Sequence, residues 1–431
     1  MMATGFEICN MKSNSFGKYF GFTAFGESHG QYMGLVIEDV LPNIEFPYRD
    51  LQIALEKRRP GQAEYTSQRK ENDDFEVISG VFEGKTTGMP ICILFKNNDF
   101  RSEDYEFLRN QFRAAHADFS WFQKYKIYDF RGGGRASGRE TISRVAAGAF
   151  IKNILGNILI NVYPIKIGHI CIRSYDESFK ETNSLSWCCP DTYDDVSIIL
   201  KSTQDELDSL GAIVEAQILN IPAGLGDPVF EKLDANLAKA ILSIGGVRGI
   251  EFGSGFELSE MKGSEAYLPH HQGGILGGVS DGNTIKLRIA LKPISSIGKP
   301  VQNLAQIKGR HDTCLVPRIL SVIESMIQLV LADAIAHQDL ISSKEKDLNS
   351  YREALDKIDE DLIISLYRRF EISKNIGVYK NKYNLPVFDE NRENEIYSNI
   401  FEIADELDLS LDLVKNIWSL ILDESKKRQS K

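Results

Sequence analysis

Apolar and polar positions alternate over short stretches in the first hundred residues, and this pattern predicts strands separated by glycine turns. A short aromatic run that ends at Phe25 is strand-like, residues 35–46 (LVIEDVLPNIEF) predict a strand and a turn, and residues 77–95 predict further strands. Between these strands, the spacing predicts a helix from Arg49 to the sequence EKRRPG. The N-terminal part therefore mixes strands with one helix.

The middle of the chain adds three predicted helices. From Arg139 onward, ETISRVAAGAFIKNIL predicts a buried helix whose small residues allow close packing. Residues 155–220 alternate in strand fashion, and GDPVFEKLDANLAKAILSI predicts a helix with Asp227 near its start. Glycine-dense loops between short strands follow, and a long apolar helix ends near His337. The pattern to this point predicts an α+β domain over residues 1–338.

The composition changes after residue 338. Residues 339–349 form a polar linker, and residues 350–431 are rich in charge, poor in glycine and helical in pattern. An apolar stripe runs at helical spacing through Leu355, Ile358, Leu362, Leu366, Arg369, Ser373, Ile376 and Lys380. We expect Arg369 and Lys380, eleven residues or about three turns apart, to face the same buried side. A charge on a core stripe needs an anionic partner, which favours a binding site over a bundle that only oligomerises.

Composition narrows the class of protein. The 431 residues are 42% hydrophobic and 26% charged, typical of a globular protein, and the net charge of -11 argues against a nucleic-acid partner. No uninterrupted apolar run approaches the ~20 residues that span a bilayer, and the N-terminus does not resemble a secretory signal. The six cysteines lack a CxxC pair, which fits reduced thiols in a cytoplasm. We therefore expect a cytoplasmic protein with no membrane partner.

The most distinctive stretch is DFRGGGRASGRETISR, from Asp129 to Arg144. Three glycines, Gly132 to Gly134, let the backbone bend sharply and approach a ligand. Arginines at 131, 135, 139 and 144 frame the turn and can fork onto phosphate or carboxylate groups, next to a helix N-terminus that favours anions. A tight surface turn with solvated charges is the alternative explanation.

Three other loops carry titratable side chains. The loop FGESHG holds Ser28 and His29 together with little steric cover, FRAAHAD places His116 three residues after Arg113, and a third charged loop holds Arg310, His311 and Asp312. Histidines beside arginine or serine favour proton transfer on an anionic ligand. Arg58 and Arg59 lie at a helix C-terminus, where cations are also favoured for structural reasons. Adjacent residues on a strand point to opposite faces, so His270-His271 does not predict a metal site.

Taken together, FGESHG, RGGGRASGRET and GRHDTC resemble the motifs of chorismate synthase, in the expected order. RRPG at 58–61, HAD at 116–118, GGILGG at 273–278 and KPISS at 292–296 support the resemblance over residues 14–338. It implies a β-α-β sandwich, a homotetramer, a reduced FMN cofactor and elimination of phosphate from 5-enolpyruvylshikimate 3-phosphate to give chorismate. The implied flavin-binding residues are Arg135, Ala136, Ser137, Gly245, Gly246, Gly277, Lys292, Pro293, Ile294, Ser295, Ser296 and Arg310.

The resemblance also assigns roles at the reacting centre. Four arginines would clamp the two carboxylates and the phosphate of the substrate: Arg58, Arg113, Arg139 and Arg310. His116 would serve the flavin, His29 the departing phosphate, and Asp312 with Ser28 the return of the proton.

Several positions depart from the family pattern. Ala114-Ala115 replaces proline-glycine, His270-His271 replaces an asparagine pair, and Thr313 replaces a proline. These changes affect the stiffness of the loops more than their chemistry. Glu64 stands where many members carry an arginine that contacts a nicotinamide cofactor, so NADPH as the reductant stays open.

Residues 350–431 are similar to the all-helical chorismate mutases. The family's active-site positions fall on Arg352, Arg369, Lys380, Asp389, Arg392, Glu393, Ser425 and Gln429. A Claisen rearrangement requires a compact dianion and stabilisation of the breaking ether rather than a nucleophile. The resemblance implies that Arg369 and Arg352 hold carboxylates, Lys380 and Gln429 the ether oxygen, and Glu393 the ring hydroxyl.

In this second family the first helix is exchanged between subunits, so Arg352 would come from a partner chain. The sequence therefore predicts a bifunctional enzyme that makes chorismate and converts it to prephenate. Two alternatives remain: a synthase whose appendage is a dimerisation or effector-sensing module, and a non-catalytic flavin-binding protein with idle histidine loops.

Overall fold

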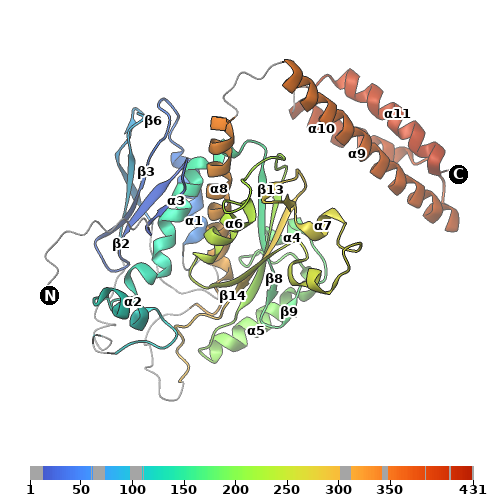
Figure 1. Cartoon of the computed structure of the whole chain (residues 1–431). Coiled ribbons are helices and arrows are strands. Elements are labelled where there is room, and N and C mark those ends of the chain that lie inside the picture. Colours follow the sequence, from blue (N-terminus) through green and yellow to red (C-terminus); the bar gives the residue numbers. More distant parts are fainter. Residues whose placement is uncertain are drawn as a thin grey trace. The chain divides into compact units, whose positions relative to one another are not determined.

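The computed structural model describes residues 13–59, 61, 73–97, 109, 111–300, 312–341, 348–383, 385–406 and 409–429. The chain divides into two compact units, a first unit of Met1–Ile341 and a helical unit of Ser342–Lys431 (Figure 1).

An antiparallel sheet from the N-terminal residues forms one layer of the first unit. Its strand order is β1 (Ser15–Phe16), β2 (Phe22–Gly26), β3 (Tyr32–Ile37), β7 (Ile91–Lys96) and β4 (Phe75–Ser79), and a small hairpin joins β5 (Val81–Phe82) to β6 (Lys85–Thr86). Alternate residues of β3 and β7, including Leu35 and Ile93, are fully buried, as expected for a sheet with one face on the core. The strands predicted over residues 77–95 are confirmed.

A second antiparallel sheet forms the opposite layer (Figure 1). Its order is β11 (Val247–Phe252), β14 (Ile285–Leu291), β10 (Ala212–Leu219), β8 (Leu159–Ile167) and β9 (Ile170–Cys171), with a hairpin of β12 (Ile275–Leu276) and β13 (Val279–Ser280) nearby in sequence. Its inward residues, such as Val214 and Ile289, are also fully buried.

Four helices lie between the two sheets (Figure 1): α1 (Tyr48–Arg58), α3 (Thr141–Ile151), α6 (Leu233–Leu242) and α8 (Val316–Ile341). The small residues of α3 allow the close packing that the sequence predicted, because a Cβ on Gly148 would approach the Ser325 Cβ of α8 to 2.6 Å. Shorter helices complete the unit: α2 (Asp118–Tyr125), α4 (Glu177–Lys180), α5 (Tyr193–Asp205), α7 (Pro269–Gln272) and the 3-10 turns η2 (Gly134–Ala136), η3 (Gly138–Glu140), η4 (Lys152–Leu155), η5 (Pro190–Thr192) and η6 (Gly255–Glu260).

Helix α8 corrects the expectation that no segment is long and apolar enough to span a bilayer. Residues Val316–Asp339 meet that criterion by length and composition, and 61% of the apolar window is buried inside the protein. The helix contacts α3, α6, α1 and strand β8. Its apolar character is therefore explained by its central place between two sheets.

Three further expectations were wrong or only partly right. Residues 155–220 are not all strands, since α5 buries Val196 and Leu200 at helical spacing. His270 and His271 lie on the short helix α7 rather than on a strand, with their ring centres 4.0 Å apart. Asp227 lies before α6, not within it, and pairs with His337.

The helical unit contains α9 (Leu348–Lys382), α10 (Glu390–Glu406) and α11 (Leu411–Gln429). Helices α8 and α9 both extend into residues 339–349, the predicted linker, and residues 342–347 lie outside the described residues. The described residues confirm an all-α unit after the α+β sandwich.

The predicted apolar stripe of α9 is only partly buried in this chain. Ser373 is buried, but Leu355, Leu362 and Ile376 are 59%, 56% and 41% exposed. Helix α11 packs against α9, whereas no described residue covers these side chains. An apolar stripe indicates that a helix face packs against a partner surface. It does not indicate which chain supplies that surface.

Candidate functional site

Ser28 and His29 lie in the turn between β2 and β3. The hydroxyl oxygen of Ser28 lies 3.1 Å from Nδ1 of His29. Both residues are buried, at 4% and 3% exposure, so the expectation of little steric cover was wrong. The cover comes from the glycine turn, because a Cβ on Gly132 would collide with the His29 imidazole.

The glycine turn connects this histidine to the loop of the second one. Gly132, Gly133 and Gly134 all have positive φ, at 60°, 91° and 53°, which an L side chain adopts only with strain. A Cβ on Gly133 would lie 3.2 Å from Nη2 of Arg113. Three glycines are therefore needed to pass the backbone between His29 and Arg113.

Two of the predicted substrate arginines share one buried carboxylate. Asp73 accepts hydrogen bonds from Nη2 of Arg58 at 2.6 Å and from Nη1 of Arg139. Burial alone would raise the pKa of Asp73, but the two guanidinium groups outweigh it and hold the pKa below its usual value. Arg139 also donates through Nε to Oδ1 of Asn97 at 3.0 Å, and the Asn97 amide donates to the carbonyl oxygens of Glu27 and Gly30.

The third arginine, Arg113, is held by Asp118 at the start of α2. Its Nε and Nη2 donate to the two carboxylate oxygens at 2.8 and 2.7 Å, and its backbone N–H donates to the same group at 3.1 Å. The pKa of Asp118 is lowered, because these bonds outweigh the effect of burial. The fourth arginine, Arg310, lies outside the described residues.

His116 bridges two loops. Its Nδ1 lies 2.8 Å from the Ala114 carbonyl oxygen, and its Nε2 lies 2.9 Å from the hydroxyl oxygen of Ser296. Burial, with a contribution from the charge of Arg113, lowers the pKa of His116 below 6.5. Ala115, where the family pattern has glycine, adopts a φ of +57°.

The segment Lys292 to Ser296 follows β14 and lies beside this histidine. The Lys292 backbone N–H donates to the carbonyl oxygen of Gly246 at 2.9 Å, and its amine bonds to Ser295. Burial and the nearby charge of Arg248 lower the pKa of Lys292. The Ile294 carbonyl oxygen accepts a hydrogen bond from the Ser209 hydroxyl. Pro293 lies between Lys292 and Ile294 in the same segment. Gly246, Lys292, Ser295, Ser296 and His116 are thus connected.

Other predicted residues are less closely connected. Arg135 donates to the backbone oxygens of Gly26 and Ala24, and Ser137 accepts from the Arg139 backbone N–H. Gly277 lies between β12 and β13, and Gly245 precedes Gly246. A Cβ on Gly277 or on Gly245 would meet no atom within 4 Å. Asp312 is paired with Arg318 at 2.7 Å. No described hydrogen bond joins Gly277 to the segment from Lys292 to Ser296.

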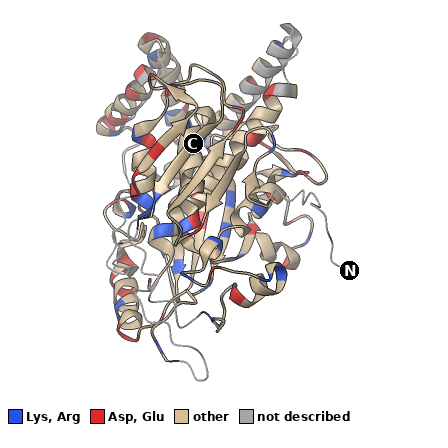
Figure 2. Ribbon diagram, turned by 90° about the vertical axis from the view of Figure 1, so that its left-hand side faces the viewer, with Lys and Arg blue, Asp and Glu red and all other residues tan. Residues whose placement is uncertain are grey.

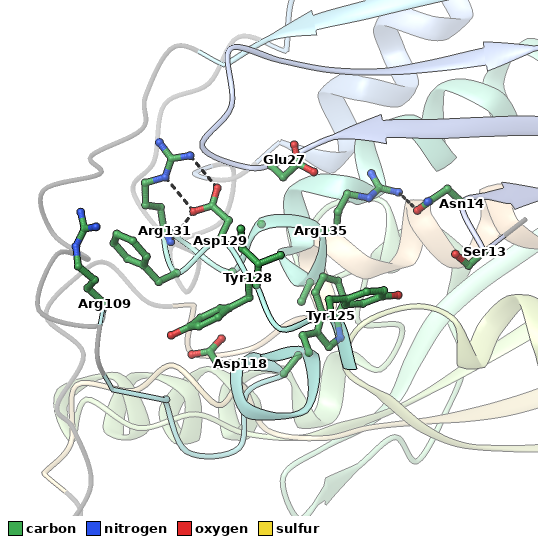
Figure 3. A pocket seen from close by; sticks show the side chains of 17 residues that line it. Ser13, Asn14, Glu27, Arg109, Asp118, Tyr125, Tyr128, Asp129, Arg131 and Arg135 are labelled. Atoms are coloured by element: carbon green, nitrogen blue, oxygen red, sulfur yellow. Dashed lines mark hydrogen bonds and ion pairs between the residues drawn. The ribbon is translucent and has the colours of Figure 1, made fainter. Parts of the chain in front are cut away.

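A cavity of about 1040 Å³ opens beside the glycine turn (Figure 3). Arg135 and Ala136 lie on its wall, together with Trp121, Tyr125 and Tyr128. Figure 3 shows two of the four framing arginines, with Arg131 forked onto Asp129 and Arg135 bonded to Asn14.

The remaining two framing arginines point to other partners. Arg144 bonds to Glu140 and to Ser243, and Arg139 bonds to Asp73. The four arginines therefore do not form one pocket.

In the helical unit, the predicted residues of α9 bond to α11 and to the loop before α10. Arg369 donates to the Ser425 hydroxyl at 2.5 Å, and Lys380 donates to the Val387 carbonyl at 2.7 Å. Oε1 of Gln429 is buried and has no hydrogen-bond partner among the described residues. Both cations are half-buried, and burial lowers the pKa of Arg369.

The start of α10 confirms the predicted cap. Asp389 accepts from the Arg392 backbone N–H at 3.0 Å, and Glu393, in the first turn, pairs with Lys426 of α11 at 3.2 Å. The Arg392 side chain pairs with Glu395. Arg352 is 17 residues before Arg369 on the same helix, about 25 Å away, and is exposed. Arg352 therefore cannot reach Arg369 in its own chain.

Sequence reasoning missed the residues that hold the arginines. Asp73, Asn97 and Asp118 received no role from the sequence, and Trp121 was not expected beside a cavity. The signal for Asp118 was available, because it follows His116 in the same HAD motif. Figure 2 shows Lys and Arg positions interspersed with Asp and Glu positions along the ribbon.

Comparisons with known proteins identify both units. A family model described as chorismate synthase matches residues 20–336, and one described as chorismate mutase type II matches residues 351–430. A chorismate synthase of Flavobacterium psychrophilum is 42% identical over 346 residues, which cover 75% of this chain and 97% of the relative. One of Syntrophus aciditrophicus is 42% identical over 353 residues, which cover 77% of this chain and 100% of the relative.

The fold agrees with these matches. A crystal structure of chorismate synthase superimposes with a TM-score of 0.60 at 26% identity, and covers 80% of this chain and 98% of that one. Both resemblances drawn from the sequence motifs are confirmed. The chain belongs to the chorismate synthase family, and it carries a chorismate mutase type II domain C-terminal to the synthase domain in sequence.

Proposed function

We propose that the first unit is a phosphate lyase that eliminates phosphate from 5-enolpyruvylshikimate 3-phosphate to give chorismate, and that the helical unit is an isomerase that rearranges chorismate to prephenate. For the synthase, the proposal is carried by the glycine turn, which passes between His29 and the arginine of the His116 loop. His29 thereby lies against one side of this turn, and Arg113, three residues before His116, lies against the next glycine.

The buried arginines supply the binding of an anionic substrate. Arg58 and Arg139 are buried guanidinium groups held by Asp73, and a guanidinium can fork onto a substrate carboxylate or phosphate. Arg113 is already paired with Asp118 and would bind an anion as part of that pair. Arg310 stays a predicted ligand of an anionic group of the substrate.

The two histidines are suited to different proton transfers. The Ala114 carbonyl can only accept a hydrogen bond, so Nδ1 of His116 carries the proton and Nε2 is the basic atom. With a lowered pKa, His116 is neutral at pH 7 and can take up a proton at Nε2. His29, oriented by Ser28, would donate a proton to the departing phosphate. The return of the proton by Asp312 together with Ser28 stays a prediction.

The residues present fit a flavin. Gly245 and Gly277 leave open space where a Cβ would stand, and Lys292 supplies a cation at one end of the same segment as Ser296. Reduced FMN, when bound, lends electron density to the substrate while phosphate leaves, with no net redox change. Arg135 to Ser137, Gly245-Gly246, Gly277, Lys292 to Ser296 and Arg310 would hold it. Glu64, the position that bears on NADPH as the reductant, lies outside the described residues.

The mutase proposal is carried by Arg369 and Lys380, which both lie half-buried on α9, and by Gln429 at the end of α11. Two half-buried cations suit a compact dianion, and the side-chain amide of Gln429 can donate through its nitrogen to the oxygen of the breaking ether bond. Lys380 and Gln429 would face the ether oxygen and Glu393 the ring hydroxyl, while Asp389, Arg392 and Ser425 shape the site.

We further propose that the assembly completes the mutase site. The exposed stripe of α9 needs a cover, and Arg352 lies too far from Arg369 in its own chain. Exchange of α9 between subunits would cover the stripe and bring a partner's copy of this arginine to the site. We propose that the exchange takes place within a homotetramer and that the enzyme is cytoplasmic. A dimerisation or effector-sensing module remains the alternative for the helical unit.

The test is incubation of the full chain with 5-enolpyruvylshikimate 3-phosphate and chemically reduced FMN, with chorismate, prephenate and phosphate followed together. We expect phosphate release with chorismate as an intermediate and prephenate as the product. Phosphate release with chorismate accumulating and no prephenate contradicts the mutase assignment. Absence of phosphate release by folded, FMN-saturated protein contradicts the synthase assignment.

A further inference from the structure

Gly377 lies at the contact between α9 and α11, and it is the only glycine in the sequence of the helical unit. The residue is buried within α9. A Cβ at this position would lie 2.6 Å from the carbonyl oxygen of Gln429 and 2.7 Å from its Cα. Both of these atoms belong to the backbone, so the last turn of α11 rests directly against the backbone of α9.

The conformation of Gly377 does not itself call for a glycine. The residue has the backbone geometry of an α-helix, in which alanine is more favourable than glycine. The contact with Gln429 is therefore the feature that excludes a side chain. To bring a Cβ from 2.6 Å to the 3.4 Å of an ordinary contact, the two backbones would have to separate by about 0.8 Å or more.

The same contact places Gln429 near Lys380. Gly377 and Lys380 are three residues apart on α9, and residues at this spacing are neighbours on one helix face. The Gln429 backbone therefore lies about one turn from Lys380, the other residue that we expect at the ether oxygen. Because the two backbones would separate, a side chain on Gly377 would displace the Gln429 amide relative to Lys380.

Two contacts between side chains also hold the end of α11 on α9. The Arg369 guanidinium donates to the Ser425 hydroxyl at 2.5 Å, and the Arg428 guanidinium lies 4.5 Å from the ring centre of Phe370. Side chains can follow a small shift of the helix by rotating. The contact at Gly377 joins backbone to backbone and cannot adjust in this way, so it sets how closely α11 approaches α9.

We propose that Gly377 is a positioning residue for the mutase reaction. By admitting the backbone of α11, it sets the distance of the Gln429 amide from Lys380 and hence from the breaking ether bond. Gly377 acts through Gln429 and does not itself contact the substrate. This inference rests on the proposed mutase function and adds a residue to which that function assigns no role.

The test is Gly377→Ala in the full chain, with chorismate consumption and phosphate release measured on one preparation. A displacement of about 1 Å at a catalytic group costs about 100-fold, so we expect kcat for chorismate consumption to fall by that factor. KM for chorismate should stay within about threefold of wild type, because the ether oxygen needs its donor chiefly in the transition state. Phosphate release should persist.

Asn375→Ala is the matched control. It also replaces a residue of α9 by alanine, but at an exposed position two residues before Gly377, which points to nearly the opposite side of the helix. Both rates should stay at the wild-type value in this variant. A loss of chorismate consumption in Asn375→Ala equal to that in Gly377→Ala would show a general effect of changing α9, and it would overturn the inference.

A double-mutant cycle separates positioning from a general packing role. Gln429→Ala alone should lower kcat by about 100-fold, and adding Gly377→Ala should then cost less than about threefold, because the amide that Gly377 positions is already absent. An equal loss in both backgrounds overturns the inference, as does an unchanged kcat in Gly377→Ala. Loss of helix content in Gly377→Ala, measured by circular dichroism, also overturns it, since the contact would then hold the whole bundle together.

The wild-type chain distinguishes failure of this inference from failure of the proposed function. A folded wild type that consumes no chorismate disproves the mutase function. A wild type that consumes chorismate at a rate unaffected by Gln429→Ala disproves the role of Gln429 and this inference with it, while the mutase function stands.

Discussion

The substitution Arg369→Ala distinguishes two roles of the helical unit, catalysis and assembly of the enzyme alone. Arg369 is half-buried on α9, donates to the Ser425 hydroxyl at 2.5 Å, and lies on the same helix as Lys380. If its guanidinium binds a substrate carboxylate, truncation removes a charge-assisted contact from a partly desolvated site. Removing one such donor costs the transition state about 4 kcal/mol, which is roughly a thousandfold in rate.

The assay is prephenate formation from added chorismate, with phosphate release from 5-enolpyruvylshikimate 3-phosphate measured on the same preparation. We expect the first rate to collapse and the second to persist. Lys374→Ala removes an exposed cation from the same helix and is the matched control, which should leave both rates unchanged. A bundle that only oligomerises tolerates the loss of Arg369, because replacing an unpaired, partly buried charge by an apolar group is often stabilising. An unchanged rate of prephenate formation in Arg369→Ala therefore refutes the reasoning.

Four other predictions concern the synthase unit and the connection between the units. His116→Ala should lower kcat by about 100-fold with little change in substrate affinity, and an unchanged rate makes His116 structural. Because the pKa of His116 is lowered in the folded, ligand-free protein, its neutral form persists as pH falls through 6.5, so the acidic limb of the kcat/KM profile should lie below 6.5; a limb above 6.5 contradicts the burial argument. Ala115→Gly should stabilise the protein by about 0.5–1 kcal/mol in chemical denaturation, since it relieves a φ of +57°, whereas Ala114→Gly should not stabilise it. Separately expressed residues 1–341 and 348–431 should retain phosphate release and chorismate consumption respectively, and a folded, FMN-binding first piece without phosphate release argues against the assignment.

The sequence predicted the elements whose pattern is local. The helix after the glycine turn was recognisable from its small residues, and Gly148 does pack closely on Ser325. Helix α5 was missed because Val196 and Leu200 lie within a region whose neighbours alternate in strand fashion.

The site was predictable in its motifs and less so in its pairings. The contact between Asp73 and Arg139 spans 66 positions of sequence, and neither residue's neighbours indicate it. The cover over His29 likewise comes from a turn about a hundred positions later. On α9 the stripe of Leu355 and Leu362 was correctly read as apolar, but an amphipathic pattern contains no information about which chain covers it.

The central place of α8 has a consequence for synthesis of the protein. Val316–Ile341 is the last segment of the first unit to leave the ribosome, yet the core between the two sheets cannot close without it. Until then the nascent chain exposes the inner faces of two sheets, which favours aggregation. The 90 residues from Ser342 to Lys431 take about 5–18 s to translate at typical elongation rates, and during that interval the complete first unit is still tethered. The helical unit therefore gives the sandwich time to close before the chain is released.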